Sequence, residues 1–229
     1  MSQNSNWSPS AIAWDIETCP MPLSTLTHRQ RRRLKKEYAA KAKRSPEEGV
    51  TTLVRKAMSF HGFLCWICCV SLSWRDQDGE IEVVSRSASR PVDERGLIEW
   101  VWRNVSKKIR SRSGVRWVTF NGKKFDCRIL RTRSLRHEVQ ITNEDLLDEY
   151  PFSYKPHADV AALWREDWTG LEDVADLFGI VYESEIDGAE VAKAMTEGRT
   201  DLVEQHCEAD AMTTLEIYEH VKDLDPEVR

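Results

Sequence analysis

Two carboxylates lie within the first markedly apolar run of the chain, and they constrain the fold more than any other feature. The run covers residues 11–17 and predicts a buried strand that contains Asp15 and Glu17. Residues two apart in a strand point to the same face, at most about 7 Å from each other. Two like charges on one buried face are costly unless cations or hydrogen-bond donors compensate them. A divalent metal ion is the natural compensation, because such ions bind oxygen ligands.

The length and composition are those of a single globular domain. The chain has 229 residues, of which 41% are hydrophobic, and we expect one domain over residues 1–229 with its core at about 11–220. Six cysteines without regular spacing, and no hydrophobic leader after Met1, predict an intracellular, cytoplasmic protein with reduced thiols. No stretch is long enough to span a membrane, so no membrane partner is expected.

The charges are segregated along the chain. Residues 1–137 contain 27 Lys and Arg against 13 Asp and Glu, whereas residues 138–229 contain 6 against 25. The basic half suggests a surface that meets phosphate groups, and the acidic half offers carboxylates for metal binding as well as solvated helix faces. A soluble surface without either role is the alternative reading of the same pattern.

A strongly basic segment follows the first strand. Residues 28–44 carry nine Lys and Arg on good helix-forming sequence with almost no apolar residues. They predict a protruding helix within an insertion over about residues 21–60. Such a helix could bind the nucleic-acid backbone, or it could be only a solvated insertion; the sequence leaves both open.

The remaining pattern predicts an α/β fold with a mixed sheet flanked by helices. Apolar residues 63–74 and alternating residues 80–85 flank a turn and predict a hairpin, and residues 115–120 predict a further buried strand. Strands that come first, with helices around and after them, are typical of layered α/β folds. The predicted helices cover residues 93–110, 124–136, 158–164, 171–178, 189–195 and 202–221.

Acids recur in three short segments whose order resembles a known superfamily. These segments are Asp15-Ile16-Glu17-Thr18, Asn121-Gly122-Lys123-Lys124-Phe125-Asp126 and His206-Cys207-Glu208-Ala209-Asp210. The chain resembles the DEDD superfamily of 3′–5′ exonucleases, which have a ribonuclease H-like fold. Within it, the chain is most similar to predicted exonucleases like the proofreading domain of family B DNA polymerases. The segment His157-Ala158-Asp159 and the helix that ends at Gly179 support this likeness.

The resemblance implies a catalytic site with two divalent metal ions, Mg²⁺ or Mn²⁺. It places Asp15 between the two ions, Glu17 and Asp210 at the ion that activates water, and Asp126 at the second ion. Hard oxygen ligands favour these metals over zinc. Two such ions can clamp the attacking and leaving oxygens of an in-line phosphodiester displacement.

The chain departs from the family pattern at the general base. In the tyrosine subtype the base lies four residues before the last Asp, and in the histidine subtype it lies five before. This chain has a hybrid, with His206 four residues before Asp210. An imidazole, with an unperturbed pKa of about 6.5, is a better base near neutrality than a phenol of about 10. We predict that His206 orients or deprotonates the attacking water, the alternative being a residue on the helix surface.

The same resemblance suggests substrate contacts. Asn121 and Phe125 stand where the family positions the terminal nucleotide, and Lys123 and Lys124 would flank its phosphates. Thr18, next to the first acid pair, is a further candidate. Core packing for Phe125 and plain surface positions for the lysines are the alternatives.

The predicted activity is that of a metal-dependent 3′–5′ exonuclease. It would release nucleoside 5′-monophosphates from the 3′ end of single-stranded nucleic acid, with DNA favoured over RNA. A protein that acts in replication or repair is a possible partner of such an enzyme. One alternative is an RNA 3′-end exoribonuclease of the same fold. Another is a module that binds nucleic acid without cleaving it.

Overall fold

A five-stranded mixed sheet forms the middle layer of the molecule. The computed structural model describes residues 9–42, 49–109, 114–164, 169–225 and 228. The strand order is β3-β2-β1-β4-β5, antiparallel from β3 to β1 and parallel from β1 to β5. The strands are β1 (Ala11–Pro20), β2 (Cys65–Arg75), β3 (Ile81–Ser87), β4 (Arg116–Thr119) and β5 (His157–Asp159). The predicted mixed sheet is therefore confirmed.

The central strand β1 alternates between two faces of the sheet. Ile12 and Trp14 pack into the larger core cluster, whereas Ala11 and Ala13 belong to the cluster formed with α7 (Thr200–Lys222). Asp15 and Glu17 continue the alanine face, so both carboxylates are directed toward α7. The pairing register of β1 with β2 shifts between Glu17 and Thr18, which is a bulge of the kind that often re-aims side chains at active sites.

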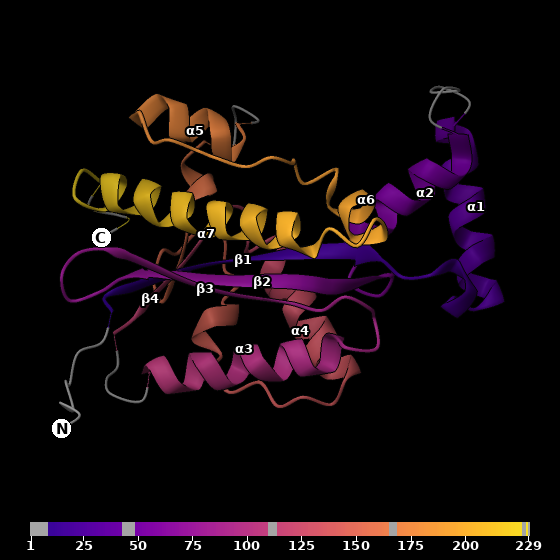
Figure 1. Ribbon diagram of the computed structural model, residues 1–229, viewed down its shortest axis with the longest axis horizontal. Coiled ribbons are helices and arrows are strands. Elements are labelled where there is room, and N and C mark those ends of the chain that lie inside the picture. The colour runs from indigo at the N-terminus through magenta and orange to yellow at the C-terminus, as the bar shows by residue number, and fades with distance from the viewer. Residues whose placement is uncertain (1–8, 43–48, 110–113, 165–168, 226–227, 229) are drawn as a thin grey trace.

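Helices cover both faces of the sheet (Figure 1). The α7 helix, which contacts β1, β2 and β3, lies on one face together with α5 (Leu171–Phe178) and α6 (Val191–Thr196). The opposite face is covered by α3 (Glu94–Ile109) and α4 (Asp126–Arg136). The described residues also form three 3₁₀ helices: Leu23–Thr25, Asp145–Leu147 and Val160–Trp164. Every described helix is too short or too polar to cross a membrane.

One predicted element was wrong. The sequence predicts a helix over residues 158–164, but His157–Asp159 form strand β5 and only Val160–Trp164 turn into a 3₁₀ helix. β5 pairs with β4 from Trp117 to Thr119, and this tertiary pairing determines its conformation. Three residues are too few for a strand periodicity to be visible in the sequence.

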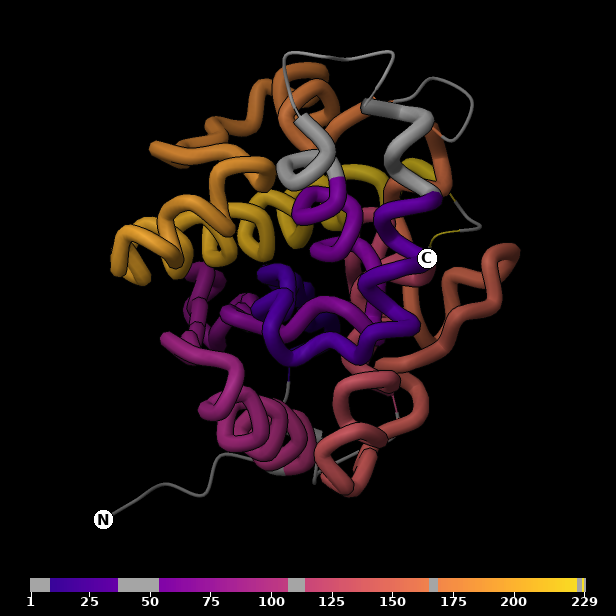
Figure 2. The backbone as a smooth tube through the Cα atoms, turned by 90° about the vertical axis from the view of Figure 1, so that its right-hand side faces the viewer, coloured from indigo at the N-terminus to yellow at the C-terminus, as the bar shows by residue number. Residues whose placement is uncertain are grey.

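The basic segment forms one arm of a helical pair that protrudes at the end of β1 and β2. Helices α1 (His28–Ala42) and α2 (Gly49–Ser59) stand beside the sheet in Figure 1 and face the viewer in Figure 2. Leu34 of α1 is buried against Met58 of α2, so the protruding helix has a small core of its own. The basic side chains of α1 that the structure describes are exposed, and residues 43–44 of the predicted helix lie outside the described residues.

Candidate active site

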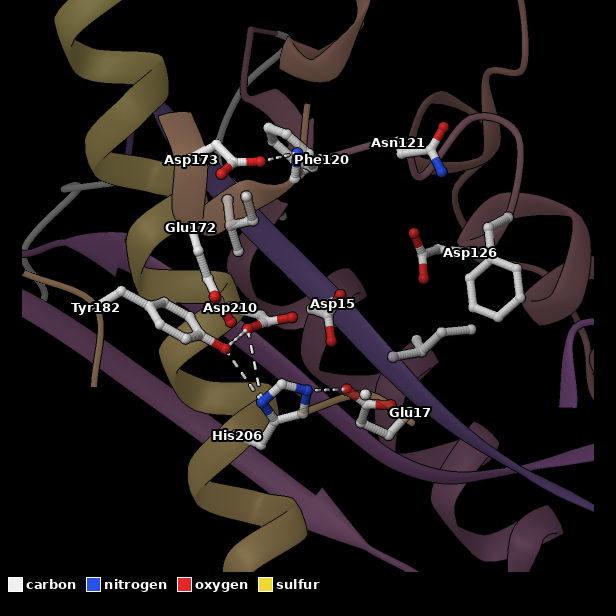
Figure 3. Close-up of a pocket in the computed structure, with 15 residues that line it drawn as sticks. Asp15, Glu17, Phe120, Asn121, Asp126, Glu172, Asp173, Tyr182, His206 and Asp210 are labelled. Atoms are coloured by element: carbon white, nitrogen blue, oxygen red, sulfur yellow. Dashed lines mark hydrogen bonds and ion pairs between the residues drawn. The ribbon is translucent and has the colours of Figure 1, made fainter. Parts of the chain in front are cut away.

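One pocket brings together all four acids that the sequence singled out. It has a volume of about 340 Å³ and is lined by Asp15 and Glu17 from β1, Asp126 from the start of α4, and His206 and Asp210 from α7 (Figure 3). Asp126 opens its helix directly after the turn that follows β4, and His206 and Asp210 lie one helical turn apart. Asp15 and Asp210, 195 positions apart in the chain, meet because α7 packs on β1, and Asp126 joins them because β4, which precedes its helix, pairs with β1.

Burial and mutual repulsion dominate the electrostatics of the pocket. Burial, and then the charge of Asp210, raise the pKa of Asp15 to about 8, although the Cys207 thiol opposes this by donating to Asp15 Oδ2 across 3.4 Å. Burial also raises the pKa of Glu17 and of Asp126, and in both cases Asp15 is the next largest cause. Each of these carboxyl groups is therefore easier to protonate than a free carboxyl group, and a bound cation would oppose that protonation.

The donor set fits divalent cations that prefer oxygen. Ligand atoms of Glu17, His206 and Asp210 lie within 4.8 Å of one another and could hold one ion. Asp15 stands between Asp210 and Asp126 in Figure 3, so its carboxylate oxygens are at the centre of the acidic cluster. Burial raises the pKa of Asp210 as well, while His206 and a hydrogen bond from Tyr182 lower it.

His206 is held in one tautomer by two hydroxyl groups. Its Nδ1 lies 3.1 Å from Tyr182 Oη and 3.0 Å from Ser184 Oγ. Tyr182 donates its own proton to Asp210 Oδ1 (2.7 Å), and Ser184 donates its proton to the Ile186 carbonyl (2.6 Å). Because both hydroxyl protons are already used, both oxygens accept at Nδ1, and Nδ1 must carry a hydrogen. The hydrogen-bond network thus assigns the lone pair of the neutral ring to Nε2.

Nε2 faces the pocket and not solvent. It lies 3.2 Å from Glu17 Oε1, and the His206 side chain as a whole is only 5% exposed. The alternative of a residue on the helix surface is therefore wrong. A basic nitrogen beside Glu17 in the pocket is in the right place to receive a proton from water bound there.

Sequence reasoning missed three residues of the site. Tyr182 and Ser184 lie in the irregular segment between α5 and α6, and Glu172 lines the pocket from the first turn of α5. The alternation of Tyr182, Ser184 and Ile186 with exposed Glu183 and Glu185 is the signal that could have identified a segment with one inward face. A single glutamate at a helix start carries no comparable signal.

Asn121 and Phe125 line the same pocket, as the resemblance suggests. Asn121 adopts a left-handed backbone conformation (φ 63°), which asparagine tolerates better than most residues. Asp159 fixes this turn, because its carboxylate accepts the backbone N–H of Asn121 (2.6 Å) and of Lys123 (3.2 Å). Asp159 thus supports the pocket without lining it.

Lys123 has a structural environment that differs from the predicted one. The side chain is 3% exposed, and its ammonium group donates to Asp148 Oδ2 (2.8 Å) and to the carbonyls of Tyr150 (2.7 Å) and Ser153 (2.8 Å). All three ammonium protons are therefore used within the protein. Lys123 anchors the segment 148–153, and its ammonium group has no proton left for a phosphate.

Thr18 is likewise unavailable to a ligand, whereas Lys124 is available. The Thr18 hydroxyl is buried and donates to the carbonyl of Ser59 (2.7 Å), so it joins the end of β1 to the end of α2 outside the acidic pocket. Lys124 is exposed, and it lines clefts on both sides of Phe125. Of the three polar substrate contacts beside Asn121 that the resemblance suggested, Lys124 alone has a side chain available to a ligand.

Comparison with protein families gives a match over most of the chain. Residues 59–228 match the family described as predicted 3′-5′ exonucleases related to the exonuclease domain of PolB. The matched residues include Asp126, His206 and Asp210, and β1 adds Asp15 and Glu17 from outside them. No curated protein matches the chain. The mixed sheet flanked by helices agrees with the ribonuclease H-like fold expected of such an exonuclease. The chain therefore belongs to the family of predicted 3′-5′ exonucleases related to the exonuclease domain of PolB.

Proposed function

We propose that this protein is a metal-dependent exonuclease that removes nucleoside 5′-monophosphates from the 3′ end of single-stranded nucleic acid, with DNA favoured. The observation that carries the proposal is the convergence of Asp15, Glu17, Asp126 and Asp210 on one pocket beside His206. The relation of the family to the exonuclease domain of PolB supports the reaction and the preference for DNA.

Two divalent ions, Mg²⁺ or Mn²⁺, are part of the proposal. Asp15 would contact both, Glu17 and Asp210 would complete one site, and Asp126 would complete the other. The central place of Asp15 between Asp210 and Asp126 supports this arrangement. When bound, such ions polarise the phosphodiester and lower the pKa of a bound water. Burial raises the pKa of all four acids, and repulsion between neighbouring carboxylates adds to it; a bound cation would relieve both effects.

In the proposed mechanism, His206 acts as the general base. Water beside the Glu17 carboxylate gives a proton to Nε2 and attacks phosphorus, and the P–O3′ bond breaks. Products are a nucleoside 5′-monophosphate and a strand whose new terminal 3′ oxygen takes a proton from solvent. Tyr182 and Ser184 are positioning residues, because they accept the Nδ1 hydrogen and so keep Nε2 directed at the water.

The terminal nucleotide is proposed to lie against Asn121 and Phe125, which border the acids. Lys124 is available for a neighbouring phosphate. An exoribonuclease of the same fold would use the same acids, and the choice between DNA and RNA is one outcome of the experiment below. A module that only binds nucleic acid would not need four acids and an oriented imidazole in one pocket.

The test is an exonuclease assay on 5′-labelled single-stranded DNA and RNA with Mg²⁺ or Mn²⁺. Wild type should shorten the strand stepwise from its 3′ end and release 5′-monophosphates. Asp15→Asn should reduce the rate about 10³-fold or more, since the shared carboxylate is lost. Asp176→Asn, an exposed acid of α5 outside the pocket, is the matched control and should keep wild-type activity. Binding without shortening under either metal would refute the enzyme and favour the module.

A further inference from the structure

The turn between α2 and β2 presents two phenylalanines to solvent. Phe60 and Phe63 are each 70% exposed. The turn is nevertheless fixed, because Met58 and Leu64 on either side are buried and the Leu64 N–H donates to the His61 carbonyl across 2.7 Å. Large apolar side chains held outward on an ordered turn are typical of a contact surface.

This turn adjoins the active-site pocket through Phe125. The rings of Phe60 and Phe125 lie 5.7 Å apart between centroids. Phe125 lines both the acidic pocket and a neighbouring cleft of about 260 Å³, which Phe60 and Phe63 also line. A strand that leaves the pocket past Phe125 therefore meets the two exposed rings next.

The same cleft carries positive charge. Lys124 and Arg128 line it from the beginning of α4, and both are exposed. Neither forms an ion pair with an acid of the described residues. Aromatic faces next to unpaired cations are the combination with which proteins bind single-stranded nucleic acid, since bases stack and phosphates are neutralised.

A second route from the pocket, past Asn121, is less suited to phosphates. It leads to a larger cleft beside the exposed rings of Tyr150 and Phe152. Lys124 lines this cleft as well, but the ammonium group of Lys123 is already neutralised there by Asp148. The lining also contains two acids, Asp159 and Glu149, of which Glu149 is paired with Arg131 (3.0 Å), whereas the first cleft is lined by Lys124 and Arg128 and by no acid among the described residues. Charge complementarity therefore indicates that the nucleic-acid strand leaves the pocket along Phe60 and Phe63.

We propose that Phe60, Phe63, Lys124 and Arg128 form a subsite for the nucleotides on the 5′ side of the bond that is cut. The two rings stack on successive bases, and the two cations contact the phosphates between them. This proposal rests on the proposed exonuclease function and defines its substrate class: an unpaired strand of several nucleotides, because stacking on the rings needs exposed base faces.

The first test compares a long and a short substrate. The specificity constant kcat/KM is measured for an oligothymidylate of about eight nucleotides and for the p-nitrophenyl ester of thymidine 5′-monophosphate, which has no upstream nucleotide. The ratio of the two constants should fall about 10-fold for Phe60→Ala and again for Phe63→Ala. An unchanged ratio in the double variant would overturn the subsite.

Matched variants separate stacking from general damage to the protein. Phe60→Trp should keep the wild-type ratio, because a larger ring still stacks, whereas Phe60→Leu should lower it. Phe152→Ala removes a ring that is 77% exposed on the other route and should leave the ratio unchanged. An equal fall in Phe152→Ala would overturn the choice of route.

The second test measures binding without cleavage. In the Asp15→Asn background with a chelator, the anisotropy of a fluorescent oligothymidylate gives Kd as a function of salt. Lys124→Ala and Arg128→Ala should each reduce the slope of log Kd against log salt by about 0.7. If wild type cleaves no substrate, the proposed function fails, while this binding test still decides the subsite. If wild type cleaves and the slopes do not change, the phosphate contacts alone are refuted.

Discussion

Carboxylates are buried in two regions of this molecule, and the two regions compensate the charge differently. Glu94 of α3 is fully buried, and it accepts hydrogen bonds from a backbone N–H of β2 (2.8 Å), from Arg133 (2.8 and 2.5 Å) and from His137 (2.7 Å). In the active-site pocket, Asp15 and Glu17 instead face further acids, and their pKa values are raised. An acid whose charge is paired within the protein can stabilise the fold. Acids that repel each other instead favour binding of a cation, which would compensate their charge.

The largest difference is expected in stability. Glu94→Gln should lower the free energy of unfolding by about 3–5 kcal/mol, because it leaves the Arg133 guanidinium buried without a counter-charge. Asp15→Asn should change it by less than about 1 kcal/mol in a chelator, or increase it, because one of several repelling charges is removed. Urea unfolding followed by tryptophan fluorescence measures both. Equal losses in the two variants would contradict the distinction between the two regions.

The next effect is the linkage between stability, metal and pH. Unfolded Asp15 releases its proton near pH 4 and folded Asp15 near pH 8, so without metal the free energy of unfolding should fall as pH rises between these values. Mg²⁺ or Mn²⁺ at about 100 times its Kd should restore about 2.7 kcal/mol at pH 8. The gain should be smaller at pH 5, where protons compete for the carboxylates.

Thermal unfolding with and without metal at both pH values tests this linkage. Glu94→Gln serves as the control, because its site lies on the other face of the sheet from α7 and should keep the metal-dependent gain. Asp15→Asn should lose most of the gain. A gain of equal size in wild type and Asp15→Asn would show that the metal acts elsewhere.

The two regions also differ in how far the sequence predicts them. Asp15 and Glu17 stand out because acids interrupt an apolar strand, and their order relative to Asp126 and Asp210 carries the family resemblance. Glu94 reads as an ordinary acid in the first turn of a helix, since its partner lies 39 residues away. A local sequence pattern identifies residues that are unusual for their secondary structure, such as acids in an apolar strand. It does not identify a long-range ion pair whose members are each ordinary for their own helix.

The same reasoning explains the remaining differences. Lys123 resembles a phosphate contact in a basic motif, but its three acceptors come from a later segment that no periodicity brings near. Tyr182 lies in an irregular segment, and its position depends on how the chain passes between α5 and α6. Strand β5 was not predicted because its three residues are too few to show a strand periodicity. In each case a tertiary contact determines the outcome.

The smallest expected effect concerns Tyr182, which brings a hydrogen-bond donor to the otherwise repelling acids. Tyr182→Phe removes the O–H that donates to Asp210 and one of the two acceptors at His206 Nδ1. It should reduce kcat on an oligonucleotide about 10-fold, because the base loses part of its orientation while remaining in place. The concentration of Mg²⁺ or Mn²⁺ needed for half-maximal rate should rise, because Asp210 is no longer held.

Ser184→Ala is the matched comparison, because it removes the other Nδ1 acceptor without touching Asp210. It should reduce kcat about 3-fold and leave the metal requirement unchanged, since one hydroxyl still fixes the tautomer. A purely structural role for Tyr182 would lower the unfolding free energy while leaving kcat and the metal requirement unaltered in the folded protein. Equal metal requirements in both variants would show that the hydrogen bond from Tyr182 to Asp210 does not affect metal binding. The Tyr182 hydroxyl would then act on kcat only through His206.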